Sequence, residues 1–160
     1  MESTRLHSVL IDDVTWSCAT RPRRAEWVGA INELCDEARF SRPAGPGADA
    51  ALRGYVTVYK NGITVALHDP AGHVVEQVEL PQTLLRPLFK EYMDIIRDMM
   101  RGGHSQNSAQ WEALDIAKRL THDDAAESLQ QAFQQAEPDH PTARRLFTLL
   151  VTLTHDTTRL

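Results

Sequence analysis

Alternating hydrophobic and polar residues mark the first half of the chain as strand-rich. Aromatic and β-branched residues fill Tyr55–Lys60 and Ile63–Leu67, and the pair Asn61-Gly62 between them is typical of a two-residue type I′ turn. A second turn, His68–Gly72, leads into a third run, Val74–Leu80. The pattern therefore predicts a three-stranded antiparallel meander.

Two predicted elements and a loop surround the start of this meander. Apolar residues at Leu6–Ile11 and Val14–Trp16 predict a first strand region, a candidate fourth strand, which Asp12-Asp13 interrupts as a bend or bulge. Apolar residues at helical spacing then predict a helix over 25–39. The proline- and glycine-rich stretch within 41–54 predicts a loop, whose role the sequence does not reveal.

After Leu80 the hydrophobic period becomes helical and stays so. Apolar residues from Leu84 to Met99 predict one long helix that ends at Gly102-Gly103, because glycine commonly follows a helix. Pro87 lies within its first turns and is a candidate for the true start of the helix.

Three shorter helices are expected to follow. Ser108 is predicted to cap the first, and Thr121–Asp124 to form the junction with the second, which covers 125–136. The last helix, Pro141–Leu153, is apolar on nearly every side in its second half, so other elements should pack around it. The buried anchors expected in the first of the three are Trp111, Leu114, Ile116 and Leu120.

The order of these elements predicts a single α+β domain over 1–160. A β-rich part, 1–80, with one helix precedes a helical part, 81–155. A small antiparallel β-sheet of three to four strands in the N-terminal half is expected to pack against a C-terminal layer of about four helices. At 160 residues the chain is long enough to bury one core without disulfides or metal.

Composition and charge limit the cellular location and the kinds of partner that we expect for this protein. A net charge of -5 argues against non-specific nucleic-acid binding as the main activity. Two cysteines, Cys18 and Cys35, fit a reducing cytosol as free thiols. The first apolar run is too short for a signal peptide, and the last helix is too short, and too interrupted by threonine, to span a bilayer. We therefore expect a cytoplasmic protein that does not associate with membranes.

The richest cluster of polar chemistry lies near the expected helix junction. Lys118 and Arg119 stand four and three positions before His122, so each can share a helix face with it. If Arg144 and Arg145 approach them, the five residues form a candidate site for a phosphate or carboxylate, since a guanidinium group grips two oxygens at once. The alternative, which we favour, is an exposed helix face with ion pairs one turn apart.

Other candidate chemistry has simpler explanations. Four histidines stand beside an aspartate, but no two histidines have the spacing of a helical metal motif, so capping and solvent exposure account for these pairs better. The basic cluster Arg21–Arg24 lacks interleaved aromatic residues. No glycine-rich phosphate loop and no Cys-x-x-Cys pair is present. The sequence therefore predicts no metal site and no cofactor. The four histidines are His68, His122, His140 and His155.

Three motifs carry a likeness to a known group: Leu88–Tyr92, Glu112–Arg119 followed by His122, and Thr142–Leu149. With them, the chain from Tyr55 to about Thr154 resembles the uncharacterised protein family UPF0262, small proteins found mainly in alphaproteobacteria. The family favours a double arginine, a glycine and an acidic-glycine pair near the histidine, where this chain departs from it. The resemblance supports the order of elements, points to the same five polar residues and implies no activity.

Three functions are compatible with these observations, and whether the protein is an enzyme stays open. The favoured one is a non-enzymatic cytoplasmic binding, regulatory or adaptor protein that acts through its helical layer on a protein partner or a second copy. The first alternative is a small enzyme or ligand-binding domain for a phosphorylated or carboxylated metabolite, in which arginines hold the anion and His122 transfers a proton. The second alternative, which the net charge disfavours, is a nucleic-acid binder that uses a patch of Arg21, Arg23, Arg24, Arg39, Arg42 and Arg53.

Overall fold

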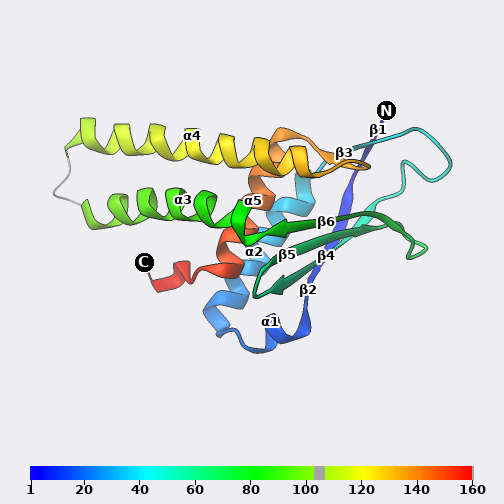
Figure 1. Ribbon diagram of the computed structural model, residues 1–160, viewed down its shortest axis with the longest axis horizontal. Helices are drawn as coiled ribbons and strands as arrows, with labels where there is room; N and C mark the ends of the chain where they lie inside the picture. Colours follow the sequence, from blue (N-terminus) through cyan, green and yellow to red (C-terminus); the bar gives the residue numbers. More distant parts are fainter. Residues whose placement is uncertain (103–106, 160) are drawn as a thin grey trace.

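A four-stranded sheet forms one layer of the protein (Figure 1). A computed structural model describes residues 1–102 and 107–159. The meander is confirmed, and the first strand joins it as a fourth strand that runs parallel to its neighbour, because a helix crosses over between the two. In order across the sheet, the strands are β2 (Leu6–Ile11), β4 (Leu52–Tyr59), β5 (Gly62–His68) and β6 (Val74–Pro81).

The turn between β4 and β5 differs from the prediction by one residue. Tyr59 pairs with Gly62, so the two loop residues are Lys60 and Asn61. Neither has a positive φ, which a type I′ turn requires at both positions, so that prediction is wrong. Gly62 lies at the start of β5, where an added Cβ would approach the carbonyl oxygen of Leu80 to 2.3 Å. The glycine therefore serves the close approach of β5 and β6.

The expected second part of the first strand is a short helix instead. Helix α1 (Asp13–Ser17) begins where Asp12 accepts a hydrogen bond from the backbone N–H of Thr15 at 3.0 Å. The other carboxylate oxygen of Asp12 accepts from the N–H of Val58, also at 3.0 Å. One residue thus ends the strand, caps the helix and ties both to the sheet.

Helices α2 (Arg21–Glu37) and α5 (His140–Thr154) cover one face of this sheet (Figure 1). The indole N–H of Trp27 on α2 donates to the carbonyl of Thr152 at 2.8 Å. The expected central position of the last helix is confirmed, because most of its side chains are buried. The buried residues of α5 are Thr142, Ala143, Leu146, Phe147, Leu149, Leu150, Val151, Thr152 and Leu153.

A second, smaller sheet ties the N-terminus to the connections around α2 and α5. Its strands, in the order β1-β3-β7, are β1 (Glu2–Thr4), β3 (Phe40–Arg42) and β7 (Glu137–Pro138). Strand β3 takes up the start of the expected loop, and the rest of that loop is held by a hydrogen bond from the Thr4 hydroxyl to the Ala48 carbonyl at 2.5 Å. Both residues are buried, so the loop is anchored at Ala48, while residues 43–47 are exposed.

Helices α3 (Gln82–Gly102) and α4 (Ser108–Ala132) lie side by side and extend well beyond the sheet (Figure 1). Helix α3 begins at Gln82, so Pro87 lies within its first turns and does not mark its start. Helix α4 is capped by Asn107, and it continues without a break through Thr121–Asp124, so the predicted junction is wrong. That stretch contains no proline or glycine, and Thr121 is buried, so packing favours continuing the helix.

The α+β class is confirmed: the described strands other than β7 gather in the N-terminal half, and α3, α4 and α5 form the C-terminal half. Because two predicted helices are one, α3, α4 and α5 are the α-helices that the structure describes after the sheet, and the 3₁₀ turn η2 (Thr157–Arg159) follows them. The core lies between the sheet and the α2–α5 pair. Much of α3 and α4 is left to project into solvent.

Candidate functional site

His122 lies where the three helices α3, α4 and α5 meet. Its Nε2 is 2.8 Å from the carbonyl oxygen of Arg144 and 3.2 Å from the hydroxyl of Thr148. Because a carbonyl oxygen only accepts, Nε2 carries the proton and donates it to Arg144. The ring also packs against Tyr92 and Phe147, with centroids 5.5 and 5.6 Å apart. The imidazole is thus a packed bridge between helices.

The electrostatic surroundings favour a neutral His122. Burial lowers the pKa of the imidazole most, and the positive charges of Arg144 and Lys118 lower it further. The hydrogen bond to the Arg144 carbonyl and the charge of Asp123 act in the opposite direction but do not outweigh them. The ring is therefore neutral, and its Nε2–H group donates to the backbone carbonyl of Arg144.

Arg144 on α5 forms an ion pair with a carboxylate on α4. Its guanidinium group donates to Asp123 on α4, and Nε2 of His140 approaches the same oxygen at 3.0 Å. The hydrogen bonds from His140 and Arg144 lower the pKa of Asp123. This cluster ties the beginning of α5 to the middle of α4, so the positive charge of Arg144 is already balanced.

The other predicted site residues point elsewhere. Arg145 pairs with Glu37 on α2 at 2.8 Å, and Arg119 pairs with Asp115 one turn before it on α4 at 3.3 Å. Lys118 acts on His122 through its charge. The structure therefore brings His122 and Arg144 together, with Lys118 near, and leaves Arg119 and Arg145 in separate ion pairs.

The proposed N-terminal basic patch also has internal partners. Arg23 donates to the carbonyls of Thr152 and Leu153 at 3.2 Å, at the end of α5. Arg24 donates to the carbonyls of Trp16 and Ser17. These two guanidinium groups therefore serve helix ends, where backbone carbonyls lack helical partners.

An apolar strip runs along the outer face of α4. Its residues are spaced four, three and four apart, which places them on one side of the helix, and all four are exposed. The predicted burial of Trp111, Ile116 and Leu120 is wrong, because 44% of Trp111, 44% of Ile116 and 59% of Leu120 is exposed. Trp111 lies on another side of the helix from the strip. We call the apolar surface the α4 strip. Its members are Ala109, Ala113, Ile116 and Leu120.

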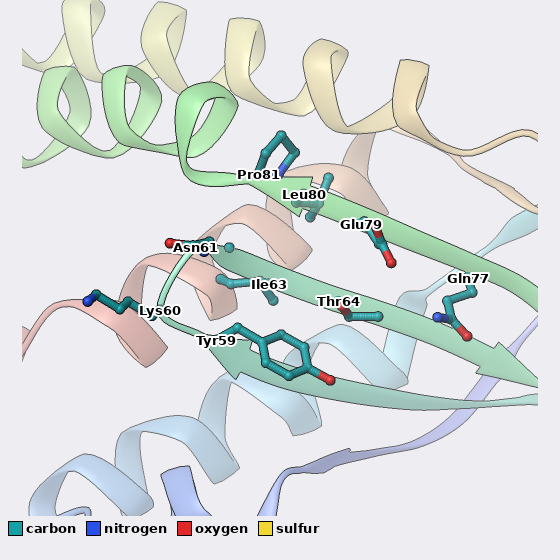
Figure 2. A pocket seen from close by; sticks show the side chains of 10 residues that line it. Tyr59, Lys60, Asn61, Ile63, Thr64, Gln77, Glu79, Leu80 and Pro81 are labelled. Carbon is teal, nitrogen blue, oxygen red and sulfur yellow. The ribbon is translucent and has the colours of Figure 1, made fainter.

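A broad hollow of about 670 Å³ lies on the outer face of the sheet at the β4–β5 turn. Figure 2 shows the ring of Tyr59 lying over the strands and the side chains of Gln77 and Glu79 on β6, while Lys60 points away from them. The polar groups at the hollow are uncharged apart from Glu79 and Lys60, and the hollow is open to solvent. It offers hydrogen bonds but no concentration of charge.

Within residues 1–102 and 107–159, no group of three His, Cys, Asp or Glu side chains is arranged to hold a metal ion. In the same residues, no helix combines the length and the apolar character needed to cross a membrane. Burial raises the pKa of the Cys35 thiol, which makes it a poorer nucleophile.

Comparison with known proteins extends the resemblance noted in the sequence. The profile of the uncharacterised protein family UPF0262 matches residues 3–156. The chain belongs to this family. A UPF0262 protein of Methylobacterium radiotolerans is 28% identical over 150 residues, which cover 93% of this chain and 92% of the relative. One of Phenylobacterium zucineum is 29% identical, with coverage of 93% and 92%.

The match covers nearly the whole chain and therefore includes β1–β3, beyond the segment that carried the resemblance. A UPF0262 protein of Paracoccus denitrificans is 30% identical over 128 residues, 78% of this chain and 79% of the relative. No solved structure matches the chain. The names of these relatives carry no activity.

Sequence reasoning missed two partners at the His122 cluster. Asp123 lies in the predicted helix junction, and Tyr92 lies within the apolar run that predicts the first long helix. Both meet residues of α5 that lie more than 20 positions away in the chain. No local pattern signals such a pairing.

Proposed function

We propose that this UPF0262 protein is a non-enzymatic cytoplasmic protein that acts through its helical layer and associates with a second copy through the α4 strip. The observation that carries the proposal is the exposure of Ile116 and Leu120 on a helix that projects beyond the sheet. Large apolar side chains grouped on one exposed face are typical of interaction surfaces. The spacing of the strip is that of a seam between two packed helices.

The strip is complementary to itself when two copies run antiparallel. A twofold axis between residues 114 and 115 places Ala109 opposite Leu120 of the partner subunit, and Ala113 opposite Ile116 of the partner subunit. Each large side chain then meets a small one, as close helix packing requires. A twofold interface repeats both contacts on its other half.

Charges beside the strip fit the same arrangement. Glu112 and Arg119 lie on the same flank of α4, both exposed. In the antiparallel pair, Glu112 lies near Arg119 of the partner subunit, and the reverse contact forms by symmetry. In a parallel pair, the twofold axis runs along the seam and places the two copies of each residue on opposite sides of it, so no Glu112–Arg119 contact forms between the subunits. Opposite charges at such flanking positions select partner and orientation.

A charge exchange tests this geometry. Glu112→Arg alone, or Arg119→Glu alone, should weaken dimerisation roughly tenfold, because like charges then face each other across the seam. The double variant Glu112→Arg/Arg119→Glu should restore it, and Leu120→Glu should abolish it. Sedimentation equilibrium over a concentration series measures each dissociation constant. Circular dichroism checks that every variant is folded.

Two results would contradict the proposal. One is a wild-type protein that stays monomeric up to about 1 mM, a range that would detect even a weak complex. The other is a double variant no better than either single variant, which would rule out the antiparallel pairing. A matched control is Arg101→Glu, on α3, where the arginine pairs with Asp98 away from the strip.

The geometry gives less support to the first alternative, a metabolite site. Of the arginines proposed to hold an anion, Arg144, Arg119 and Arg145 each face a carboxylate. An incoming anion would have to displace those partners. The neutral His122 shares its Nε2 proton with a backbone carbonyl, which leaves that proton less accessible to a substrate.

A further inference from the structure

A second cleft, of about 380 Å³, lies between the first half of α3 and the end of α5. Figure 1 shows the end of α5 close beneath α3. The ring centroids of Phe89 on α3 and His155 at the end of α5 are 5.5 Å apart, so the two segments are in contact there. The floor of the cleft is the buried pair Phe89 and Met93. Its volume falls within the range typical of small-molecule sites.

Three cationic side chains line this cleft on a single stripe of α3. Arg86, Lys90 and Arg97 stand four and seven residues apart, spacings that return to nearly the same side of a helix. The stripe spans about 16 Å at 1.5 Å per residue. In a chain with a net charge of -5, this is a local reversal of sign.

The charges of the stripe are only partly balanced within the protein. Asp94 lies beside it and pairs with Lys90 at 2.7 Å and with Arg97 at 3.6 Å. Arg86 makes no hydrogen bond or ion pair with any residue in the described part of the chain. One carboxylate for three cations leaves the cleft positive.

The helix ends around the cleft add to this potential. Gln82, the first residue of α3, lines the cleft, and the N-terminus of a helix carries a partial positive charge. The C-terminus of α5 would oppose it, but Arg23 and Trp27 donate to its last carbonyls. Burial and the charges of Arg97 and Arg23 lower the pKa of His155, which leaves a neutral imidazole at the rim.

We propose that the cleft between α3 and α5 binds a phosphate-bearing small molecule, with Arg86 and Arg97 as its principal ligands and Lys90 beside them. A guanidinium group matches the oxygens of a phosphate with two parallel hydrogen bonds. A group with two or more negative charges makes fuller use of three cations than a single carboxylate does. The site is separate from the α4 strip, so it stands or falls independently of dimerisation.

Isothermal titration calorimetry with inorganic pyrophosphate measures the dissociation constant of the site. Succinate serves as the dicarboxylate for comparison. Wild type should bind pyrophosphate, and Arg86→Gln and Arg97→Gln should each weaken binding roughly tenfold, because each removes a charge-assisted contact. The matched control Arg101→Gln removes the same charge from the same helix, outside the cleft. It should change the dissociation constant less than twofold.

Each contrary result overturns a defined part of the proposal. No heat of binding to pyrophosphate at several millimolar would remove the site. Equal weakening in Arg86→Gln and Arg101→Gln would show a general effect of the positive charges along α3 and would rule out a specific cleft. Succinate binding as tightly as pyrophosphate, with the same dependence on Arg86, would overturn the assignment to phosphate.

Discussion

Individual side chains in this protein join elements that are far apart in the sequence. His122 connects α4 to a backbone carbonyl of α5, and Trp27 connects α2 to the other end of α5. Asp12 links the end of β2 to α1 and to β4. Burial acts to raise the pKa of the Asp12 carboxyl, but its hydrogen bonds to Val58 and Thr15 outweigh burial and hold the pKa below its usual value. These contacts stabilise specific packing at points where polar groups would otherwise be buried without partners.

His122 predicts a pH dependence of stability. Its lowered pKa in the folded protein means that the unfolded chain, with an ordinary pKa near 6.5, takes up a proton at a higher pH. The free energy of unfolding should therefore fall as pH decreases through about 6.5 toward the lowered value. His155 contributes with the same sign. Urea unfolding at pH values from about 7.5 to 5.5 measures this slope.

Replacement of the imidazole isolates its share of the slope. His122→Gln should flatten the dependence between pH 7.5 and 5.5 without removing it, since His155 remains. His7→Gln, at an exposed position, should leave the wild-type slope. An unchanged slope in His122→Gln would contradict the assigned environment. The carboxyl groups with lowered pKa values, such as Asp123, act in a more acidic range, below about pH 4.

At the scale of elements, one buried carboxylate joins the sheet to the helical hairpin, which is formed by α3 and α4. Glu76 on β6 is 8% exposed. Its Oε1 accepts hydrogen bonds from the backbone N–H groups of Gln134 and Gln135 at 2.6 Å and of Ala136 at 3.3 Å. These N–H groups belong to the turn after α4, which leads into β7. The contact therefore fixes where α4 ends relative to the sheet.

Removal of this carboxylate should destabilise the protein measurably. Glu76→Ala should lower the free energy of unfolding by roughly 3 kcal/mol, because three N–H groups lose a charged acceptor. Glu76→Gln retains an acceptor oxygen without the charge and should cost about half as much. Glu79→Ala, on the exposed face of the same strand, is the control and should stay within about 0.5 kcal/mol of wild type. Equal effects of Glu76→Ala and Glu79→Ala in denaturant titrations would refute the role of Glu76.

For the molecule as a whole, packing is uneven along the helical hairpin. The buried residues of α4 begin at Thr121 and continue to Leu129, and the first half of α4 has none. Figure 1 shows that this first half lies away from the sheet. Regions with few buried contacts open at lower free energy than the core. The first half of α4 should thus be the least stable part of this helix, and it also carries the α4 strip.

Hydrogen exchange should reveal this gradient. At low protein concentration, amides of residues 112–118 should exchange faster than those of 124–131, although both lie in one helix. At high concentration, association through the strip should slow exchange in the first group. Mass spectrometry of exchanged peptides measures both. Uniform protection along α4 at low concentration would contradict the gradient.

Much of the fold could be predicted because periodicity reports which side of an element is buried. The meander, the crossover helix and the central last helix all follow from such local patterns. Errors arose where a local signal had two meanings. Asn61-Gly62 indicated a turn, but Gly62 is required by the close approach of β6. Thr121–Asp124 indicated a cap, but its residues pack and pair along one continuous helix.

The sequence by itself determined the three strands of the meander, the change to a helical period after Leu80 and the central burial of α5, because these depend on hydrophobic periods within short segments. Only the tertiary structure decided which charges meet, since Arg144 and Arg145 are adjacent yet pair with different helices. It also decided that the strip containing Ile116 and Leu120 is uncovered, because an apolar face is buried only where another element reaches it. The cleft between α3 and α5 likewise depends on how two distant segments pack.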